Sequence, residues 1–382
     1  MDKLLLIPGP SPVVPRVLDA LAMPTVSHVS PEMSADLAAA CENLKRIVFT
    51  TSGEPFVIAG AGTLSMEMAL LNVAAKSDRV LVLSQGYFGD RMGQICDAFG
   101  FESELVRSPW GRAVPAATLE KKLQENTYDV VAVTHVDTST GACAPVESYA
   151  RVLKNSGRMF IVDGVCATGG IEERMDDWGV DVILTAAQKC FGAPPGLAVC
   201  VFSERALAKR KSLASVPAYY TDILRWRPIM NDPSKYFSTH GVNEIRAFAE
   251  ATRMMIEEGL PARFARHKRT GRAFRAGFGA LGFASFTERD CLADTLSVLR
   301  YPAGFDDKAF RMTLGQNGVV VAGGLSETAG KVFRVGHMGN LSFEQVLFAF
   351  EAVEKTLDSL GYRFEMGAGI RAAKNMLNGD VS

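Results

Sequence analysis

Met159-Phe-Ile-Val-Asp163 and Asp181-Val-Ile-Leu-Thr-Ala-Ala-Gln-Lys189 are two apolar, β-branched segments, and each ends in a charged side chain. Runs of this kind are typical of strands that are buried on both faces of a parallel sheet. The carboxyl ends of such strands meet at one edge of the sheet, where ligands bind. We therefore expect Asp163 and Lys189 to face one pocket.

A lysine and a carboxylate in this arrangement suit the chemistry of pyridoxal 5′-phosphate (PLP). The amine forms an imine with the cofactor aldehyde, and the carboxylate keeps the pyridine nitrogen protonated. Taken singly, a lysine at a strand end is usually a solvated charge, and an aspartate there is often a cap or turn residue. The irregular, Gly- and Pro-rich loop Ala187–Gly196 around Lys189 favours the functional interpretation.

The composition excludes several classes of partner. The chain has 382 residues, 48% of them hydrophobic, with 41 Lys+Arg against 42 Asp+Glu. This balance provides no basic field for nucleic acid or for an anionic membrane surface, and it favours a small-molecule role. No segment approaches the ~20 apolar residues of a membrane span, and the opening apolar run is too short for a signal peptide. We expect a soluble, cytoplasmic protein.

Cysteine and histidine spacing gives no metal signature. The seven cysteines contain no C-x-x-C pair, and the five histidines contain no H-x-x-x-H pair. Scattered cysteines in apolar segments are typical of reduced, buried thiols in a cytosolic enzyme. We predict no metal site.

Seven short apolar runs alternate with amphipathic helical stretches between residues 56 and 203. This alternation predicts an α/β fold, with a mainly parallel seven-stranded sheet covered by helices on both faces. The runs are Phe56–Gly60, Arg79–Ser84, Ser103–Arg107, Val130–His135, Met159–Gly164, Asp181–Ala187 and Gly196–Ser203.

Beyond the sheet region the order of elements changes. Long helices are predicted over 244–259 and 262–281, and later strands and helices follow no strict βα order. We expect an N-terminal arm (1–16), a large domain (17–257) and a smaller C-terminal α+β domain (258–382). The proline-rich segment Pro8–Pro12 cannot be a helix or a central strand, and its rigidity suggests that the arm docks on the body of the protein.

A glycine turn follows the first apolar run and precedes a helical stretch. In Gly60-Ala-Gly62-Thr63, bare N–H groups and the positive helix end would face an anion, such as a cofactor phosphate. The turn does not match the dinucleotide-binding fingerprint G-x-G-x-x-G, because Ser65 stands where the third glycine is required. The turn Gln85–Arg91 supplies aromatic residues for stacking on a flat heterocycle, and Thr138 lies in a hydroxyl-rich turn at another strand end.

These motifs occur together and in order over nearly the whole chain. They are Ile7-Pro-Gly-Pro-Ser11, Ala59-Gly-Ala-Gly-Thr63, Gln85-Gly-Tyr-Phe-Gly-Asp-Arg91, Thr134-His-Val-Asp-Thr-Ser-Thr-Gly141, Val162-Asp-Gly-Val165, Ala187-Gln-Lys189 and Phe333-Arg-Val-Gly336. The combination resembles the class V aminotransferases of PLP fold type I, and most closely their alanine–glyoxylate and serine–pyruvate branch.

The resemblance implies a role for each matching position. Lys189 would carry the imine and shuttle the proton, Asp163 would hold the pyridinium, and Arg334 would bind the substrate carboxylate. The other implied cofactor contacts are Val165 under the ring, Phe88 stacked on it, Thr138 at the ring oxygen, and Gly62, Thr63 and Gln188 at the phosphate.

The resemblance also implies a homodimer, in which Tyr236 and Thr239 complete the phosphate site of the neighbouring subunit. The chain departs from the family pattern at Phe88, where relatives often have tryptophan, at Thr63, where some have histidine, and in 238–242. These departures leave the cofactor chemistry intact and bear on the choice of substrate.

The leading interpretation is transamination from a short neutral donor, alanine or serine, to glyoxylate or pyruvate, because Arg334 alone suggests itself as a carboxylate clamp. A 2-aminoethylphosphonate–pyruvate transaminase would share this frame. A lyase or desulfurase of the same fold would need a loop cysteine, and Cys291 lacks that context. A nicotinamide oxidoreductase would not explain Lys189 with Asp163, and a purely structural or binding module would explain neither. A visible absorbance band separates PLP enzymes from the last two classes.

Overall fold

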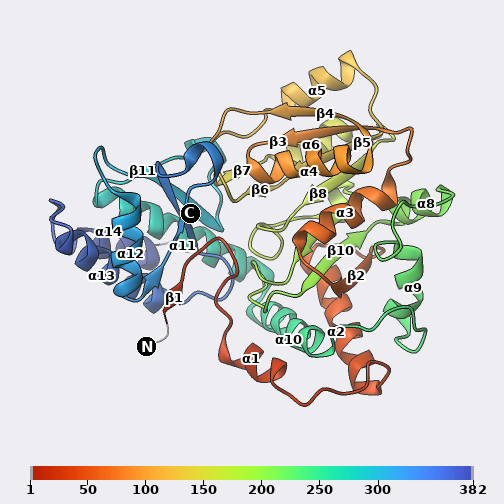
Figure 1. The fold of residues 1–382 in the computed structure, drawn as a ribbon, viewed down its shortest axis with the longest axis horizontal. Coiled ribbons are helices and arrows are strands. Elements are labelled where there is room, and N and C mark those ends of the chain that lie inside the picture. The colour runs from red at the N-terminus through yellow and green to blue at the C-terminus, as the bar shows by residue number, and fades with distance from the viewer. Residues whose placement is uncertain (1–2, 380–382) are drawn as a thin grey trace.

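The computed structural model describes residues 3–379 (Figure 1). A seven-stranded sheet with helices on both faces forms one part, and a four-stranded sheet packed against helices forms the other. The predicted α/β fold with a mainly parallel seven-stranded sheet is confirmed.

The strand order of the large sheet is β2-β10-β9-β8-β5-β3-β4. Strand β10 runs antiparallel to both of its neighbours, β2 and β9, and the remaining pairs are parallel. The strands are β2 (Glu54–Ala59), β3 (Arg79–Ser84), β4 (Glu102–Arg107), β5 (Val130–Thr134), β8 (Met159–Asp163), β9 (Val182–Ala186) and β10 (Leu197–Phe202).

Two hydrophobic cores sandwich this sheet because successive side chains of each strand point to opposite faces. In β8, Phe160 and Val162 enter one core and Ile161 enters the other. One face is covered by α3 (Gly62–Val73), α4 (Tyr87–Phe99), α8 (Glu204–Ser212) and α9 (Ile223–Asn231). The opposite core receives side chains from α1 (Pro15–Leu21), α2 (Pro31–Ile47), α5 (Ala116–Glu125), α6 (Val146–Leu153), α7 (Met175–Trp178) and α10 (Val242–Glu258).

The C-terminal part has its own core, rich in phenylalanine. Its sheet has the order β11-β12-β15-β14, with β11 (Ala284–Ser285), β12 (Leu296–Arg300), β14 (Ala322–Gly323) and β15 (Val332–Gly336). The helices that line the core are α11 (Leu260–Ala280), α12 (Asp307–Gln316), α13 (Phe343–Ser359) and α14 (Ala368–Asn378). Helix α10 ends at Glu258 and α11 begins at Leu260; the domain division at 257/258 stays a prediction.

The N-terminal segment docks on the C-terminal part before the chain enters the large sheet layer (Figure 1). Strand β1 (Leu4–Leu5) pairs in parallel with β13 (Val319–Val320), and Leu6 is buried in the C-terminal core. Pro8–Pro12 then continues to the loop that carries Lys189. The arm therefore connects the two sheets at the edge where the candidate site lies.

Within residues 3–379, no helix is long and apolar enough to cross a lipid bilayer. All seven cysteines are free thiols.

Candidate active site

A cavity of 180 Å³ lies at the carboxyl edge of the large sheet. Its walls come from β5, β8, the loop after β9, and the first turns of α3 and α4. The lining residues are Ala61, Gly62, Thr63, Met66, Phe88, Arg91, Thr134, Val136, Thr138, Asp163, Val165, Cys166, Gln188 and Lys189. Four larger hollows, of 430 to 850 Å³, have other linings, and none of them combines a lysine with a buried carboxylate.

Lys189 enters the cavity from the irregular turn between β9 and β10. Its Nζ donates a hydrogen bond to the carbonyl of Pro8, and the Ser11 hydroxyl donates to the Lys189 carbonyl at 2.7 Å. Gly9 has φ +108°, and a Cβ atom at this position would lie 2.5 Å from Lys189 Nζ. The close approach of the arm to the lysine therefore requires glycine.

Asp163 is the last residue of β8, and its side chain is only 3% exposed. One carboxylate oxygen accepts the Val165 N–H at 3.0 Å, and the other accepts the Thr134 hydroxyl at 3.2 Å. Burial raises the pKa of the Asp163 carboxyl to about 6, and the nearby acids Asp137 and Glu173 add to the increase. A carboxylate in this position would be stabilised by a cation placed against it.

The amino-terminal end of α3 provides an anion-binding surface. Gly62 begins the helix and Thr63 follows it, so free backbone N–H groups point toward the cavity edge. A Cβ on Gly62 would lie 3.2 Å from a methyl group of Val165, which makes glycine the residue that leaves this space open. The buried Oε1 of Gln188, also in the wall, has no hydrogen-bond partner within the described chain.

Phe88 is held at the cavity by the cap of its own helix. The buried carboxylate of Asp137 accepts the N–H groups of Phe88 and Gly89 at 2.9 and 3.1 Å, at the start of α4. Carboxylates stabilise helix amino-terminal ends in this way. The guanidinium of Arg91 lies 4.8 Å from the centre of the Phe88 ring.

Not every predicted site residue lines the cavity. Arg334, on β15, is buried outside its wall, with Nε bonded to the Gly323 carbonyl at 2.7 Å and Nη1 to the Thr138 carbonyl at 3.3 Å. Thr138 itself lines the cavity, so Arg334 adjoins the site through one residue. Tyr236 is 65% exposed and Thr239 is also exposed; both lie away from the cavity of their own chain.

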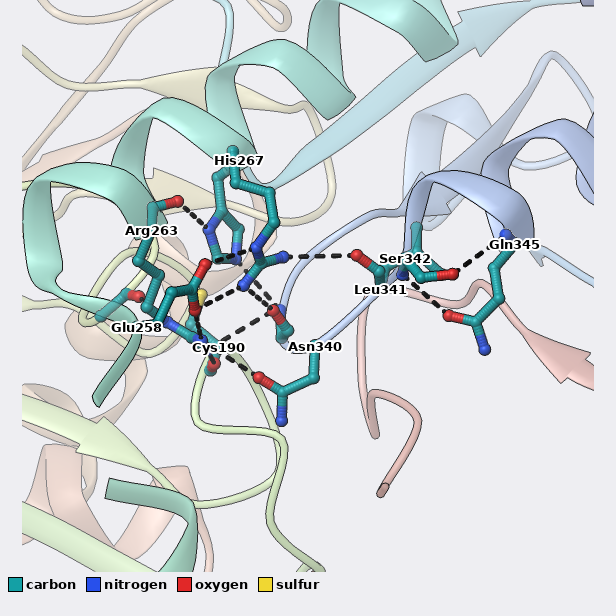
Figure 2. Close-up of polar contacts among 11 residues, drawn as sticks. Cys190, Glu258, Arg263, His267, Asn340, Leu341, Ser342 and Gln345 are labelled. Carbon is teal, nitrogen blue, oxygen red and sulfur yellow. Dashed lines mark hydrogen bonds and ion pairs between the residues drawn. The ribbon is translucent and has the colours of Figure 1, made fainter. Parts of the chain in front are cut away.

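A buried arginine supports the loop after Lys189 (Figure 2). Arg263 of α11 is fully buried and donates to the Cys190 carbonyl at 2.6 Å and the Gly169 carbonyl at 2.8 Å. It also bonds Glu258 at 2.7 Å and the Asn340 side chain at 3.0 Å. The guanidinium therefore holds the Lys189 loop to α11 and to the turn after β15.

Sequence reasoning missed several residues at this site. Asp137, Thr134, Gly9 and Arg91 each contact or line the cavity without having received a role. Arg91 had a usable signal, because residues three apart on a helix share a face and Phe88 was already expected there. The contact of Gly9 with Lys189 links residues 180 positions apart, and no local pattern encodes it.

Comparisons with known proteins agree with this geometry. The model of the class V aminotransferase family matches residues 7–346. An uncharacterized aminotransferase from Methanocaldococcus jannaschii is 36% identical over 99% of this chain and 98% of its own length. An L-aspartate–glyoxylate aminotransferase from Paracoccus denitrificans is 33% identical, covering 96% and 94%. The crystal structure of an alanine–glyoxylate aminotransferase from Nostoc sp. superposes with a TM-score of 0.90 at 31% identity, covering 94% of this chain and 96% of that one.

Proposed function

The chain belongs to the class V aminotransferases, which use PLP, and from this premise we propose that it moves an amino group from alanine or serine to glyoxylate or pyruvate. The observation that carries the proposal is the presence of Lys189 and the buried Asp163 in the wall of one cavity. A PLP enzyme must present a primary amine to the aldehyde of the cofactor and a carboxylate to the nitrogen at the other end of its ring.

The residues of the cavity fit the cofactor. Asp163 is a buried carboxylate that forms no ion pair among residues 3–379, and it would face the pyridine nitrogen. The first turn of α3 and the side-chain NH2 group of Gln188, which can donate hydrogen bonds, would lie at the phosphate end, with Gly62 leaving room beside Val165. Phe88 would cover one ring face, Val165 the other, and Thr138 would donate to the ring oxygen.

When bound, the cofactor supplies a cationic ring that accepts the electrons of the broken Cα–H bond. Asp163 would hold the proton on the ring nitrogen, since a cation beside the carboxylate offsets its burial. Lys189 Nζ would carry the proton taken from the substrate Cα, and the Pro8 carbonyl fixes its starting position. The part of the wall around Asp163 is buried, since Thr134, Thr138 and Cys166 are each no more than 3% exposed, and this burial limits the access of water to the ring-nitrogen end of the site.

The substrate carboxylate would be bound by Arg334. The Nε and Nη1 atoms of its guanidinium each donate one hydrogen bond to a backbone carbonyl. The remaining N–H groups form no other hydrogen bond within residues 3–379. A planar guanidinium can bind a carboxylate through two parallel hydrogen bonds. The two relatives above are named for the same acceptor, glyoxylate, but for different donors, aspartate and alanine. The acceptor is therefore the better supported half of the reaction.

A panel of donors tests the substrate assignment. Alanine, serine, aspartate and 2-aminoethylphosphonate would each be assayed against glyoxylate and pyruvate with the PLP-loaded protein. We expect alanine or serine with glyoxylate to give the highest kcat/KM. Activity with 2-aminoethylphosphonate and none with alanine or serine would overturn the assignment, while the PLP chemistry would stand.

We further propose a homodimer with cytoplasmic location. Tyr236 and Thr239 are exposed and outside their own cavity, as expected for residues that reach the site of a neighbouring subunit. The free thiols support a cytoplasmic location. Sedimentation at assay concentration should show a dimer; an active monomer would contradict this arrangement.

A further inference from the structure

Arg91 is a second arginine at the cavity and has no role in the mechanism above. It lies one turn along α4 from Phe88, is half-buried and lines the cavity wall. Its Nη1 donates to the Thr63 hydroxyl at 3.2 Å, and its guanidinium lies over the Phe88 ring at 4.8 Å. One side chain thus contacts both the aromatic residue of the site and the helix end that faces the expected phosphate.

The charge of Arg91 is not matched by an acid. No carboxylate within residues 3–379 forms an ion pair with it, whereas the adjacent Asp90 is taken by Arg107 at 2.9 Å. The amino-terminal end of α3 adds further positive potential at the same place. An uncompensated cation beside a helix amino-terminal end, in the wall of a cavity, indicates that an anion binds there.

We propose that Arg91 is an anion-binding residue of the cofactor-phosphate site and comes from the same subunit as Lys189. The inference rests on the proposed function. Because the Thr63 oxygen accepts a hydrogen bond from Arg91, its own proton is free to be donated to a phosphate oxygen. The remaining guanidinium N–H groups can bind the dianion directly or through water. The cation–π contact holds the Arg91 guanidinium against the Phe88 ring, and it therefore connects phosphate binding to the position of that ring.

This assignment also bears on substrate choice. A second arginine in an aminotransferase site can bind the side-chain carboxylate of a dicarboxylic donor. Here Arg91 bonds Thr63 at the α3 end of the cavity, whereas Arg334 bonds Thr138 from the C-terminal part. If the phosphate occupies Arg91, no other arginine of residues 3–379 lines the cavity to bind the side-chain carboxylate of aspartate.

The test compares PLP with pyridoxal, which lacks the phosphate. The full-length protein would be stripped of cofactor and titrated with each compound, for wild type, Arg91→Gln and Arg91→Lys. We expect Arg91→Gln to weaken PLP about 10- to 100-fold and to change the pyridoxal dissociation constant by less than about 3-fold, because only the charge-assisted contacts are lost. Arg91→Lys should recover part of the PLP affinity. Arg151→Gln, at an exposed arginine of α6 that does not line the cavity, is the matched control and should bind both compounds as wild type does.

Two outcomes would overturn the proposal. An equal loss of PLP and pyridoxal affinity would assign Arg91 to packing of Phe88. Unchanged PLP affinity with selective loss of activity toward aspartate would assign it to a substrate carboxylate. Failure of the proposed function itself would look different, since the wild-type protein would then bind neither compound with a visible absorbance change.

Discussion

Replacing Asp163 by asparagine should stabilise the cofactor-free protein while it abolishes most of its activity. The carboxyl is buried, with its pKa raised from 3.8 to about 6. A shift of about two pKa units corresponds to roughly 3 kcal/mol of destabilisation when the group is ionised. The asparagine amide misplaces one hydrogen-bond donor against Val165 or Thr134, at a cost of about 1 kcal/mol. The expected net gain at pH 7.5 is therefore about 1–3 kcal/mol.

The raised pKa of Asp163 makes the stability of the wild-type protein depend on pH. A carboxyl with a raised pKa holds its proton more tightly in the folded state, so the free energy of unfolding falls as pH rises from about 4 to about 6 and is then constant. The advantage of Asp163→Asn over wild type should be full above pH 6 and should be lost toward pH 4, where only the cost of the misplaced amide donor, about 1 kcal/mol, remains.

Urea unfolding of the stripped proteins at pH 7.5, 6.0, 5.0 and 4.5 measures this difference, with the exposed Asp97→Asn as control. Adding PLP should reverse the order, because ligand binding stabilises only the form that binds it well. An Asp163→Asn variant that is no more stable than wild type at pH 7.5, or whose stability difference does not change with pH, would refute the view of Asp163 as an unpaired buried charge.

Two further substitutions test the arm and the carboxylate site. Gly9→Ala should lower turnover by at least about 10-fold and shift the visible absorbance of the loaded enzyme, because the added Cβ meets Lys189 and the residue has φ +108°. Gly279→Ala is the control, since a Cβ there meets nothing within 4 Å. Wild-type rates in Gly9→Ala would show that the arm does not position the lysine. Arg334→Lys keeps the charge but loses the planar fork, so kcat/KM should fall about 10- to 150-fold for alanine and serine alike, and a loss confined to one donor would remove Arg334 from the α-carboxylate.

The sheet and its two charged strand ends were predictable because they depend on local patterns. Val-, Ile- and Leu-rich runs mark strands that are buried on both faces, and the position of Asp163 and Lys189 at carboxyl ends follows from the parallel order. The glycine turn at Gly62 was predictable for the same reason, since it lies between a strand and a helix that were both visible in the pattern.

What could not be predicted depends on contacts between distant segments. Helices α2, α9 and α14 were not anticipated, although α2 carries a local signal: its buried residues recur at helical spacing, and they are Met33, Leu37, Ala40, Leu44 and Ile47. The Asp137 contact with the start of α4 crosses 49 residues, and the Pro8 contact with Lys189 crosses 181. The hydrogen bond from Arg334 to the Thr138 carbonyl crosses 196 residues, and the role of Arg334 at the substrate carboxylate stays a prediction.

The most direct test of the account is the location of the covalent bond between protein and cofactor. The PLP-loaded protein would be reduced with borohydride, digested and analysed by peptide mass spectrometry, with Lys189→Ala treated in parallel. The account predicts a pyridoxyl group on Lys189 in the wild-type protein, and neither this label nor the visible absorbance band in the variant. A label on another lysine, or a reducible band that survives in Lys189→Ala, would contradict the assignment of Lys189 as the residue that binds the cofactor.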